Sequence, residues 1–184
     1  EILSAFAFIT LLLVWLHREN PFCAVVTEKH FHDLGNLLLA FVMFWTYISF
    51  SQFLIIYSGN LPREIDWYLH RIRGGWQWVV LFLALFHFFV PFFLLLFRKM
   101  KKNFSRLSTL AALIFFAHVI ADFWVIAPTF HPGKIYFHWL DLALWIGMGG
   151  IWLGIFFRTL SRHPLLPIHD PALRRVAQKT NHAK

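Results

Sequence analysis

Residues 76–97 read WQWVVLFLALFHFFVPFFLLLF, a run of 22 residues without a single Asp, Glu, Lys or Arg. A helix needs about 20 apolar residues to cross the ~30 Å hydrocarbon core of a bilayer, and this run is long enough. Three further apolar runs reach that length, and a shorter run of 15 residues opens the chain. They are Leu34–Tyr57, Leu107–Ile126, Ile135–Phe157 and the short Ile2–Leu16. We therefore predict an all-α fold, a polytopic transmembrane bundle of about five helices, the first of them incomplete.

The overall composition also indicates a membrane protein. Of the 184 residues, 59% are hydrophobic and 14% are charged, whereas soluble proteins average ~45–50% and ~25%. The 23 Phe and 9 Trp suit lipid-facing helices and the aromatic belts at membrane surfaces. These values disfavour a disordered chain, a disulfide scaffold and a cytosolic enzyme. The single cysteine, Cys23, excludes an internal disulfide and a multi-cysteine metal site.

The distribution of basic residues predicts the orientation. The chain has 17 Lys and Arg against 9 Asp and Glu, and they lie between the apolar runs, where they set membrane orientation rather than bind nucleic acid. Connections on alternate sides of the membrane carry 13 and 4 of them. Since the richer side is cytoplasmic, we expect Arg98–Arg106 and the C-terminus in the cytoplasm and Ser58–Gly75 outside. Residues 1–157 then form the bundle, and residues 158–184 form a basic, proline-containing cytoplasmic tail.

The first apolar run begins almost at the first residue, Glu1, and is too short to span a bilayer. It has neither the basic start nor the small-residue cleavage site of a signal peptide. We interpret it as a helix cut by the edge of a fragment, and we expect this chain to be the C-terminal half of a longer protein.

Ionisable side chains inside the predicted helices form two local pairs. Such residues are costly at bilayer depth and usually mark a functional site. His118 and Asp122 are one turn apart, as are His138 and Asp141, so each pair shares one helix face. Both pairs fall in the outer halves of their runs, whereas His87 lies near the middle of its run.

We interpret these five residues as a proton path that opens to the outer side. His87 is its innermost station, because imidazole titrates near neutral pH, and Ser49 and Gln52 supply hydrogen bonds from the second run. The alternative is a fixed network of hydrogen bonds that holds the helices together. Buried carboxylates need more than packing to justify their cost, which favours the proton path for Asp122 and Asp141.

The outward loop is rich in aromatic and charged residues. Aromatic side chains together with arginine are favoured at the cores of protein interfaces. We therefore predict that Trp67, Tyr68 and Arg71 dock the external partner subunits. The alternative is an ordinary aromatic belt followed by a solvated loop.

Glycines recur along the last apolar run. Gly147, Gly150 and Gly154 lie on one face, and the last two form a small-xxx-small pair. Because such pairs permit close approach of membrane helices, we predict helix packing here rather than cofactor binding.

No ligand spacing for a metal or a cofactor stands out. His30-Phe31-His32-Asp33 is best explained as a solvated cap, with Asp33 favourably placed at a helix N-terminus. His87 and His118 have depths that allow a haem between helices, which leaves a haem-b cytochrome as a minor alternative. Half of a secondary transporter is another, although the paired broken helices of that class are not evident. We predict no metal and no cofactor bound by this chain itself.

Several segments are similar to a known membrane family. They are Asp33–Leu38, Trp45–Tyr47, Ser51–Pro62, His131–Gly133, Trp139–Asp141 and Pro164–Pro171. In these segments the chain resembles a membrane component of bacterial alternative complex III that belongs to the NrfD/polysulfide-reductase-like membrane proteins. Gln52–Pro62 is the most specific part. The resemblance covers essentially the whole chain, as the C-terminal half of a longer family member.

The resemblance implies a multi-pass inner-membrane subunit of a bacterial respiratory or photosynthetic quinol:electron-acceptor oxidoreductase. Its partners are an NrfD-like quinol-binding subunit, an iron–sulfur subunit and c-type cytochrome subunits, besides membrane lipids. Those partners carry the iron–sulfur clusters and c-type haems, and a periplasmic cytochrome c or cupredoxin takes the electrons. This subunit holds no redox centre and is proposed to conduct protons, and the resemblance leaves quinol or menaquinol binding open. A purely structural membrane anchor is the main alternative.

Overall fold

The computed structural model describes residues 1–17, 26, 28–130 and 135–163. Within these ranges all regular structure is helical and no strand occurs, which confirms the predicted all-α class. The chain divides into two units, Glu1–Ile135 and Tyr136–Lys184, and each is described by itself. Residues 131–134 and 164–184 lie outside the described ranges. They include most of the predicted tail and the whole of two family-like segments, His131–Gly133 and Pro164–Pro171.

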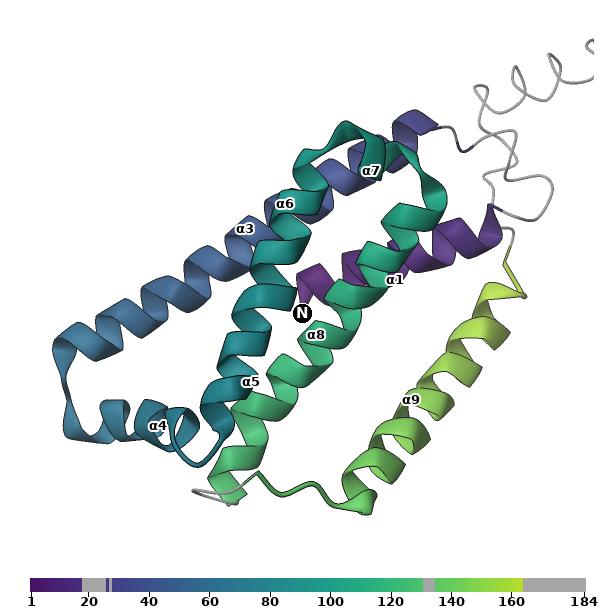
Figure 1. The fold of residues 1–184 in the computed structure, drawn as a ribbon. Coiled ribbons are helices and arrows are strands. Elements are labelled where there is room, and N and C mark those ends of the chain that lie inside the picture. The colour runs from purple at the N-terminus through teal and green to yellow at the C-terminus, as the bar shows by residue number, and fades with distance from the viewer. Residues whose placement is uncertain (18–25, 27, 131–134, 164–184) are drawn as a thin grey trace, which may run out of the picture. The chain divides into compact units, whose positions relative to one another are not determined.

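The helices of the first unit follow one another along the chain, and the second unit contributes one long helix (Figure 1). The first unit contains α1 (Ile2–Leu16), α3 (Glu28–Gly59), α4 (Pro62–Ile72), α5 (Trp76–Leu83), the π-helix η1 (Ala84–Phe89), α6 (Val90–Leu96), α7 (Arg98–Lys102) and α8 (Phe104–Phe130). The second contains α9 (Trp139–Leu160).

Four helical stretches in the described residues are long and apolar enough to cross a membrane. They are α3, α8, α9 and the continuous stretch Trp76–Leu96, which combines α5, η1 and α6. α1 is a shorter apolar helix of 15 residues. These elements fall on the five predicted apolar runs, while the number that crosses a bilayer stays a prediction.

Three helices begin at other residues than the apolar runs. α8 begins at Phe104, three residues before the predicted run. α3 has 32 residues and already begins at Glu28, because the polar turns before Leu34 continue the same helix. α9 begins only at Trp139, because His138 and Asp141 cap its first turn. Hydrophobic length therefore locates a helix but not its ends.

The core of the first unit lies where α1, α3, α6 and α8 meet. Phe31 and Leu38 of α3 are fully buried there, as are Leu95 of α6 and Ile114 of α8. Small residues also line this region, including the fully buried Ala7 of α1. Small side chains let membrane helices approach closely, so α1 packs along α8.

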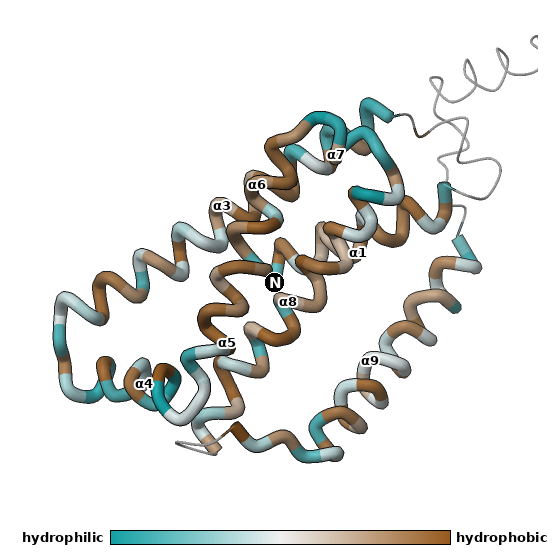
Figure 2. Tube along the Cα trace, in the orientation of Figure 1, coloured by the Kyte–Doolittle hydropathy of each residue, from teal (hydrophilic) through white to brown (hydrophobic). Residues whose placement is uncertain are grey.

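Polar residues gather at two opposite ends of the first unit, at α4 and at α7 (Figure 2). α4 runs across its end instead of along the bundle (Figure 1), and it begins with Pro62 in its first turn. The chain then passes into α5 through Gly74 and Gly75, whose φ angles are 67° and 100°. Glycine adopts these positive φ values readily, which allows the tight return from α4.

Candidate functional site: a buried histidine pair

Two histidines of the predicted proton path meet inside the first unit. His87 belongs to the stretch Trp76–Leu96 and is 0% exposed, and His118 belongs to α8 and is 6% exposed. Their rings meet edge to face, with 5.4 Å between the ring centroids. The fold thus brings together two imidazoles that lie on different helices.

The helix changes form where His87 lies. η1 is a wide turn in which the Val90 N–H bonds to the carbonyl of Leu85, five residues earlier. Pro91 has no N–H to donate to the carbonyl of His87, and its ring crowds that carbonyl, which favours the wider turn. π turns inside α-helices occur frequently at functional sites. Pro91 was the available sequence signal for this feature.

Trp45 of α3 contacts the pair from a third helix. Its ring centroid lies 4.0 Å from that of His87, so His87 contacts both an indole and an imidazole. Such packing fixes the orientation of the His87 ring. Trp45 was not among the predicted site residues, although it lies one turn before Ser49 in the same apolar run.

Three ring nitrogens of the pair are buried without a hydrogen-bond partner in the described residues. They are Nδ1 and Nε2 of His87 and Nδ1 of His118. Most buried polar atoms in native proteins are paired, and an unpaired one costs ~1–3 kcal/mol. Residues that served only to hold helices together would need such bonds. Each neutral ring retains one N–H and one lone pair through which it can exchange a proton with a group that reaches it.

The structure places the other predicted path residues of the first unit on α8 and α3. Asp122 is exposed and lies one turn beyond His118 on α8, while Ser49 is half-buried and Gln52 exposed on α3. Among the described residues, no hydrogen bond joins Ser49 or Gln52 to either histidine. Their hydrogen-bonding role in the path stays a prediction.

The geometry of the pair gives no support to a haem between these helices. Two axial imidazoles of a haem stand on opposite faces of the porphyrin, whereas these two rings are in direct contact. In the ranges that the structure covers, no group of three or more His, Cys, Asp or Glu is placed to hold a metal ion.

In the second unit, His138 and Asp141 form the N-terminal cap of α9. The His138 Nδ1 accepts a bond from the Leu140 N–H (3.3 Å), and the Asp141 Oδ2 accepts one from the His138 N–H (3.1 Å). This is a capping box, and the helix dipole favours a carboxylate in the first turn. Both residues therefore have a structural role at the end of a helix, besides the path proposed for them.

Gly147, Gly150 and Gly154 all lie on α9. Apart from the adjacent residues and the backbone of α9 itself, no atom of the described residues lies within 4 Å of a Cβ built on any of them. Helix packing at these glycines stays a prediction.

Arg71, predicted to dock a partner, points inward. It is 2% exposed, and its Nη2 donates to the Val125 carbonyl (2.6 Å) and to Thr129 Oγ1 (2.8 Å). Its guanidinium lies 3.6 Å from the ring centroid of Trp67, and Trp124 Nε1 donates to its carbonyl (3.3 Å). A cation near the C-terminal end of α8 is favoured by the helix dipole. Arg71 therefore ties α4 to α8 and is not part of an exposed docking surface.

Trp67 and Tyr68 of α4 are more exposed than Arg71. Trp67 is 36% exposed, and Tyr68 is half-buried with its ring 5.5 Å from that of Phe53. Burial raises the pKa of Tyr68, and the positive charge of Arg71 opposes that rise. Burial also lowers the pKa of Arg71. Docking of a partner at Trp67 and Tyr68 stays a prediction.

No protein-family model matches this chain, and no curated protein is significantly similar to it. The chemistry of the site therefore rests on its own residues. Those residues are two contacting imidazoles in the core of a helical unit, with an aspartate one turn further along α8.

Proposed function

We propose that this chain is a multi-pass helical subunit of a bacterial quinol:electron-acceptor oxidoreductase of the alternative complex III type, and that its histidine pair moves protons. Membership of the complex rests on the resemblance in Asp33–Pro62 and the later segments. Proton movement rests on one observation: His87 and His118 are buried in contact, with three ring nitrogens left unpaired.

The pair has the chemistry that stepwise proton transfer requires. A neutral imidazole carries an N–H on one nitrogen and a lone pair on the other, so each ring can both receive and pass on a proton. A ring rotation or one bridging water carries the proton from His87 to His118. Asp122, one turn further along α8, is the next acceptor, in the direction of the α4 end.

The proposal includes the orientation of the chain. The α7 end of the first unit carries Arg98, Lys99, Lys101 and Lys102, and the positive-inside rule assigns such an end to the cytoplasm. The bundle then has about five helices in the inner membrane, the first of them incomplete in this chain, and the C-terminus is cytoplasmic. Protons that reach Asp122 leave on the outer side, near α4.

The redox centres belong to partner subunits under this proposal. An iron–sulfur subunit and c-type cytochrome subunits carry the electrons, and an NrfD-like subunit oxidises the quinol. The chain described here contributes the proton step and holds no redox centre. The proposal assigns no quinol or menaquinol contact to the histidine pair.

A structural membrane anchor is the second candidate. Two observations favour it: Arg71 links α4 to α8, and His138 and Asp141 cap α9. Neither observation accounts for His87 and His118, whose unpaired nitrogens hold no helix in place. The anchor therefore explains the ends of the helices but not the pair in their core.

The proton proposal is tested in vesicles that contain the purified complex, with proton movement and electron transfer measured together. His118→Gln keeps a polar side chain that cannot be protonated, and it should lower the number of protons moved per electron while electron transfer continues. His70→Gln, at an exposed position of α4, is the matched control and should change nothing.

Asp141→Asn examines the second unit, because asparagine still accepts the capping bond. A lower number of protons moved per electron would indicate that α9 belongs to the path. An unchanged number would indicate that Asp141 acts only as a helix cap. If both His118→Gln and His87→Gln assemble fully and leave the ratio unchanged, the pair does not conduct protons and the anchor is the better explanation.

A further inference from the structure

Arg71 of α4 bonds to the same face of α8 that carries two residues of the proposed proton path. Its Nη2 donates to the Val125 carbonyl and to Thr129 Oγ1. His118, Asp122, Val125 and Thr129 follow one another at intervals of four, three and four residues. Residues at these intervals share one face of a helix. Arg71 therefore continues the line that begins at the buried His118 and passes through Asp122.

The guanidinium of Arg71 lies close enough to Asp122 to act on it by charge. Val125 and Thr129 follow Asp122 by ~4.5 Å and ~10.5 Å along the helix axis, at ~1.5 Å per residue. Arg71 is only 2% exposed, so water screens its charge poorly. The interaction between two charges at this separation remains substantial when the effective dielectric constant is below that of water.

The charge of Arg71 has no acidic partner in the described part of the chain. No carboxylate there forms an ion pair with it, and its Nε is buried without a hydrogen-bond partner. The Trp67 ring and the carbonyls at the end of α8 offset part of the cost. A neutral donor could make the same two bonds to α8 without burying a charge. The junction of the two helices therefore does not by itself explain why this side chain is charged.

We infer that Arg71 is an electrostatic barrier at the outer end of the proton path, and that its charge keeps external protons and other cations from returning past Asp122 to the histidine pair. Arginine side chains exclude protons and cations from membrane pores in this way. A guanidinium keeps its charge in proteins, so Arg71 repels protons and does not carry them. The inference rests on the proposed function, because a barrier matters only if protons move through the pair.

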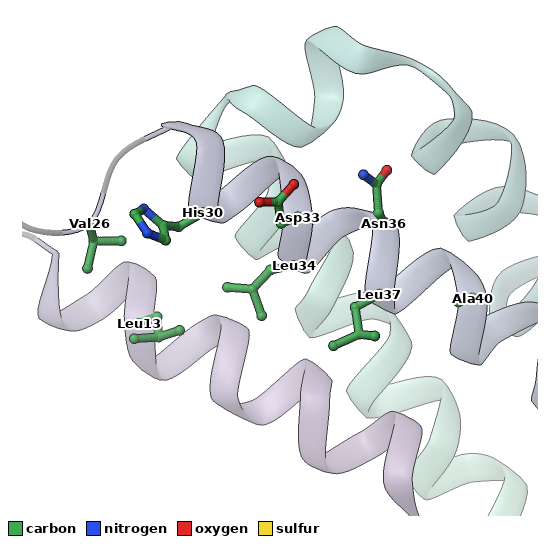
Figure 3. Close-up of a pocket in the computed structure, with 8 residues that line it drawn as sticks. All are labelled: Leu13, Val26, His30, Asp33, Leu34, Asn36, Leu37 and Ala40. Atoms are coloured by element: carbon green, nitrogen blue, oxygen red, sulfur yellow. The ribbon is translucent and has the colours of Figure 1, made fainter.

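A groove toward the α7 end is a separate opening in the first unit. It encloses about 800 Å³ between α1 and the first half of α3, and Figure 3 shows Leu13 pointing from α1 toward Leu34 and Leu37 of α3. None of its lining residues belongs to the proposed path. A leak through this groove would therefore be independent of both Arg71 and His118.

The test measures the passive proton leak of vesicles that contain the purified complex, under an applied pH gradient and without an electron donor. Arg71→Gln removes the charge and should raise the leak about tenfold, the effect of one charge ~10 Å away at an effective dielectric constant of about 20. Arg71→Lys keeps the charge and should keep the leak low. Arg73→Gln changes an exposed arginine directly after α4 and should have no effect.

Two variants of Thr129 separate the charge of Arg71 from the stability of the junction. Thr129→Asp places a carboxylate at the existing bond, which neutralises the charge and keeps α4 tied to α8, so the leak should rise. Thr129→Asn has the same size without the charge and should leave the leak low. These two variants decide the matter even if Arg71→Gln does not assemble.

Double variants identify the route of the leak. His118→Gln combined with Thr129→Asp should return the leak to the wild-type level, because the protons pass through the pair. Ala40→Trp, which fills the groove, should not reduce the leak of Thr129→Asp.

Several results would overturn the barrier. One is a wild-type leak in the assembled Thr129→Asp complex, and another is an equal rise in Thr129→Asp and Thr129→Asn. A leak that persists in the double variant with His118→Gln would show that it bypasses the path. The proposed function fails by a different result, an unchanged number of protons per electron in His118→Gln and His87→Gln. If that number falls but the leak of Thr129→Asp does not rise, the proton path stands and only the barrier is wrong.

Discussion

At Gly35 the absence of a side chain determines how closely α7 approaches α3. Lys101 lies across the glycine with its stem in contact and its ammonium bonded to Asn36. The same bond depends on the position of α7, which lies between Phe97 and Asn103 and packs against α3. A residue that looks like an ordinary member of an apolar run is therefore the point at which two helices meet.

Gly35→Ala should destabilise the protein. Alanine improves helix propensity by ~1 kcal/mol, but its Cβ would lie 2.6 Å from Lys101 Cγ, and overpacking of this kind costs ~1–3 kcal/mol. We expect a lower unfolding temperature in detergent. Gly59→Ala, where nothing lies within 4 Å of the new Cβ, is the control and should be neutral or slightly stabilising; equal behaviour of the two variants would contradict the close contact.

At the scale of single elements, the Arg71 side chain provides the hydrogen bonds from α4 to the C-terminal end of α8. Arg71 donates to Val125 and Thr129 of α8, and its guanidinium also contacts Trp67 of its own helix. The charge lies near the C-terminal end of α8, where the helix dipole favours a cation. α4 is therefore anchored through its inward face, while Asp66 and His70 remain exposed.

Arg71→Ala should loosen this junction. Hydrogen bonds to a charged group contribute ~1.5–3 kcal/mol, and a cation–π contact adds ~0.5–2 kcal/mol, so we expect a clear loss of thermal stability and faster proteolysis in α4. Arg73→Ala removes an exposed arginine directly after α4, and this variant should be as stable as the wild type. Proteolysis at the same rate in both variants would show that the Arg71 contacts do not hold α4.

At the scale of the whole molecule, the first unit has an α7 end that is rich in Lys and Arg and an α4 end of mixed charge. The positive-inside rule turns this asymmetry into an orientation. Because the histidine pair lies in the core between these ends, the orientation also decides in which direction the proposed proton step operates.

The orientation of the chain in the membrane can be determined by cysteine labelling in intact cells, after Cys23 has been replaced by Ser. Asn103→Cys, at the α7 end, should be protected from a membrane-impermeant thiol reagent. Gly59→Cys, at the α4 end, should react. The reverse pattern would place α7 outside and would reverse the direction of the proposed proton release.

Part of this architecture followed from local properties of the sequence. A helix that crosses a membrane needs a certain apolar length. That length can be counted within a single run of residues, without knowledge of the rest of the fold. The four long helices and the short α1 therefore coincide with the predicted runs. The ends of α3 and α9 did not, because polar turns continue one helix and a capping box delays the other.

The sequence by itself determined the helical class, the approximate positions of the helices and the presence of ionisable residues within them. Only the tertiary structure decided that His87 faces His118 and Trp45, that Arg71 points inward and that Lys101 lies over Gly35. In a soluble helix, apolar periodicity would have indicated the inward face. In a bilayer both the lipid and the core are apolar, so the pattern does not distinguish the two faces, and the rotation of each helix is set by its packing against the others.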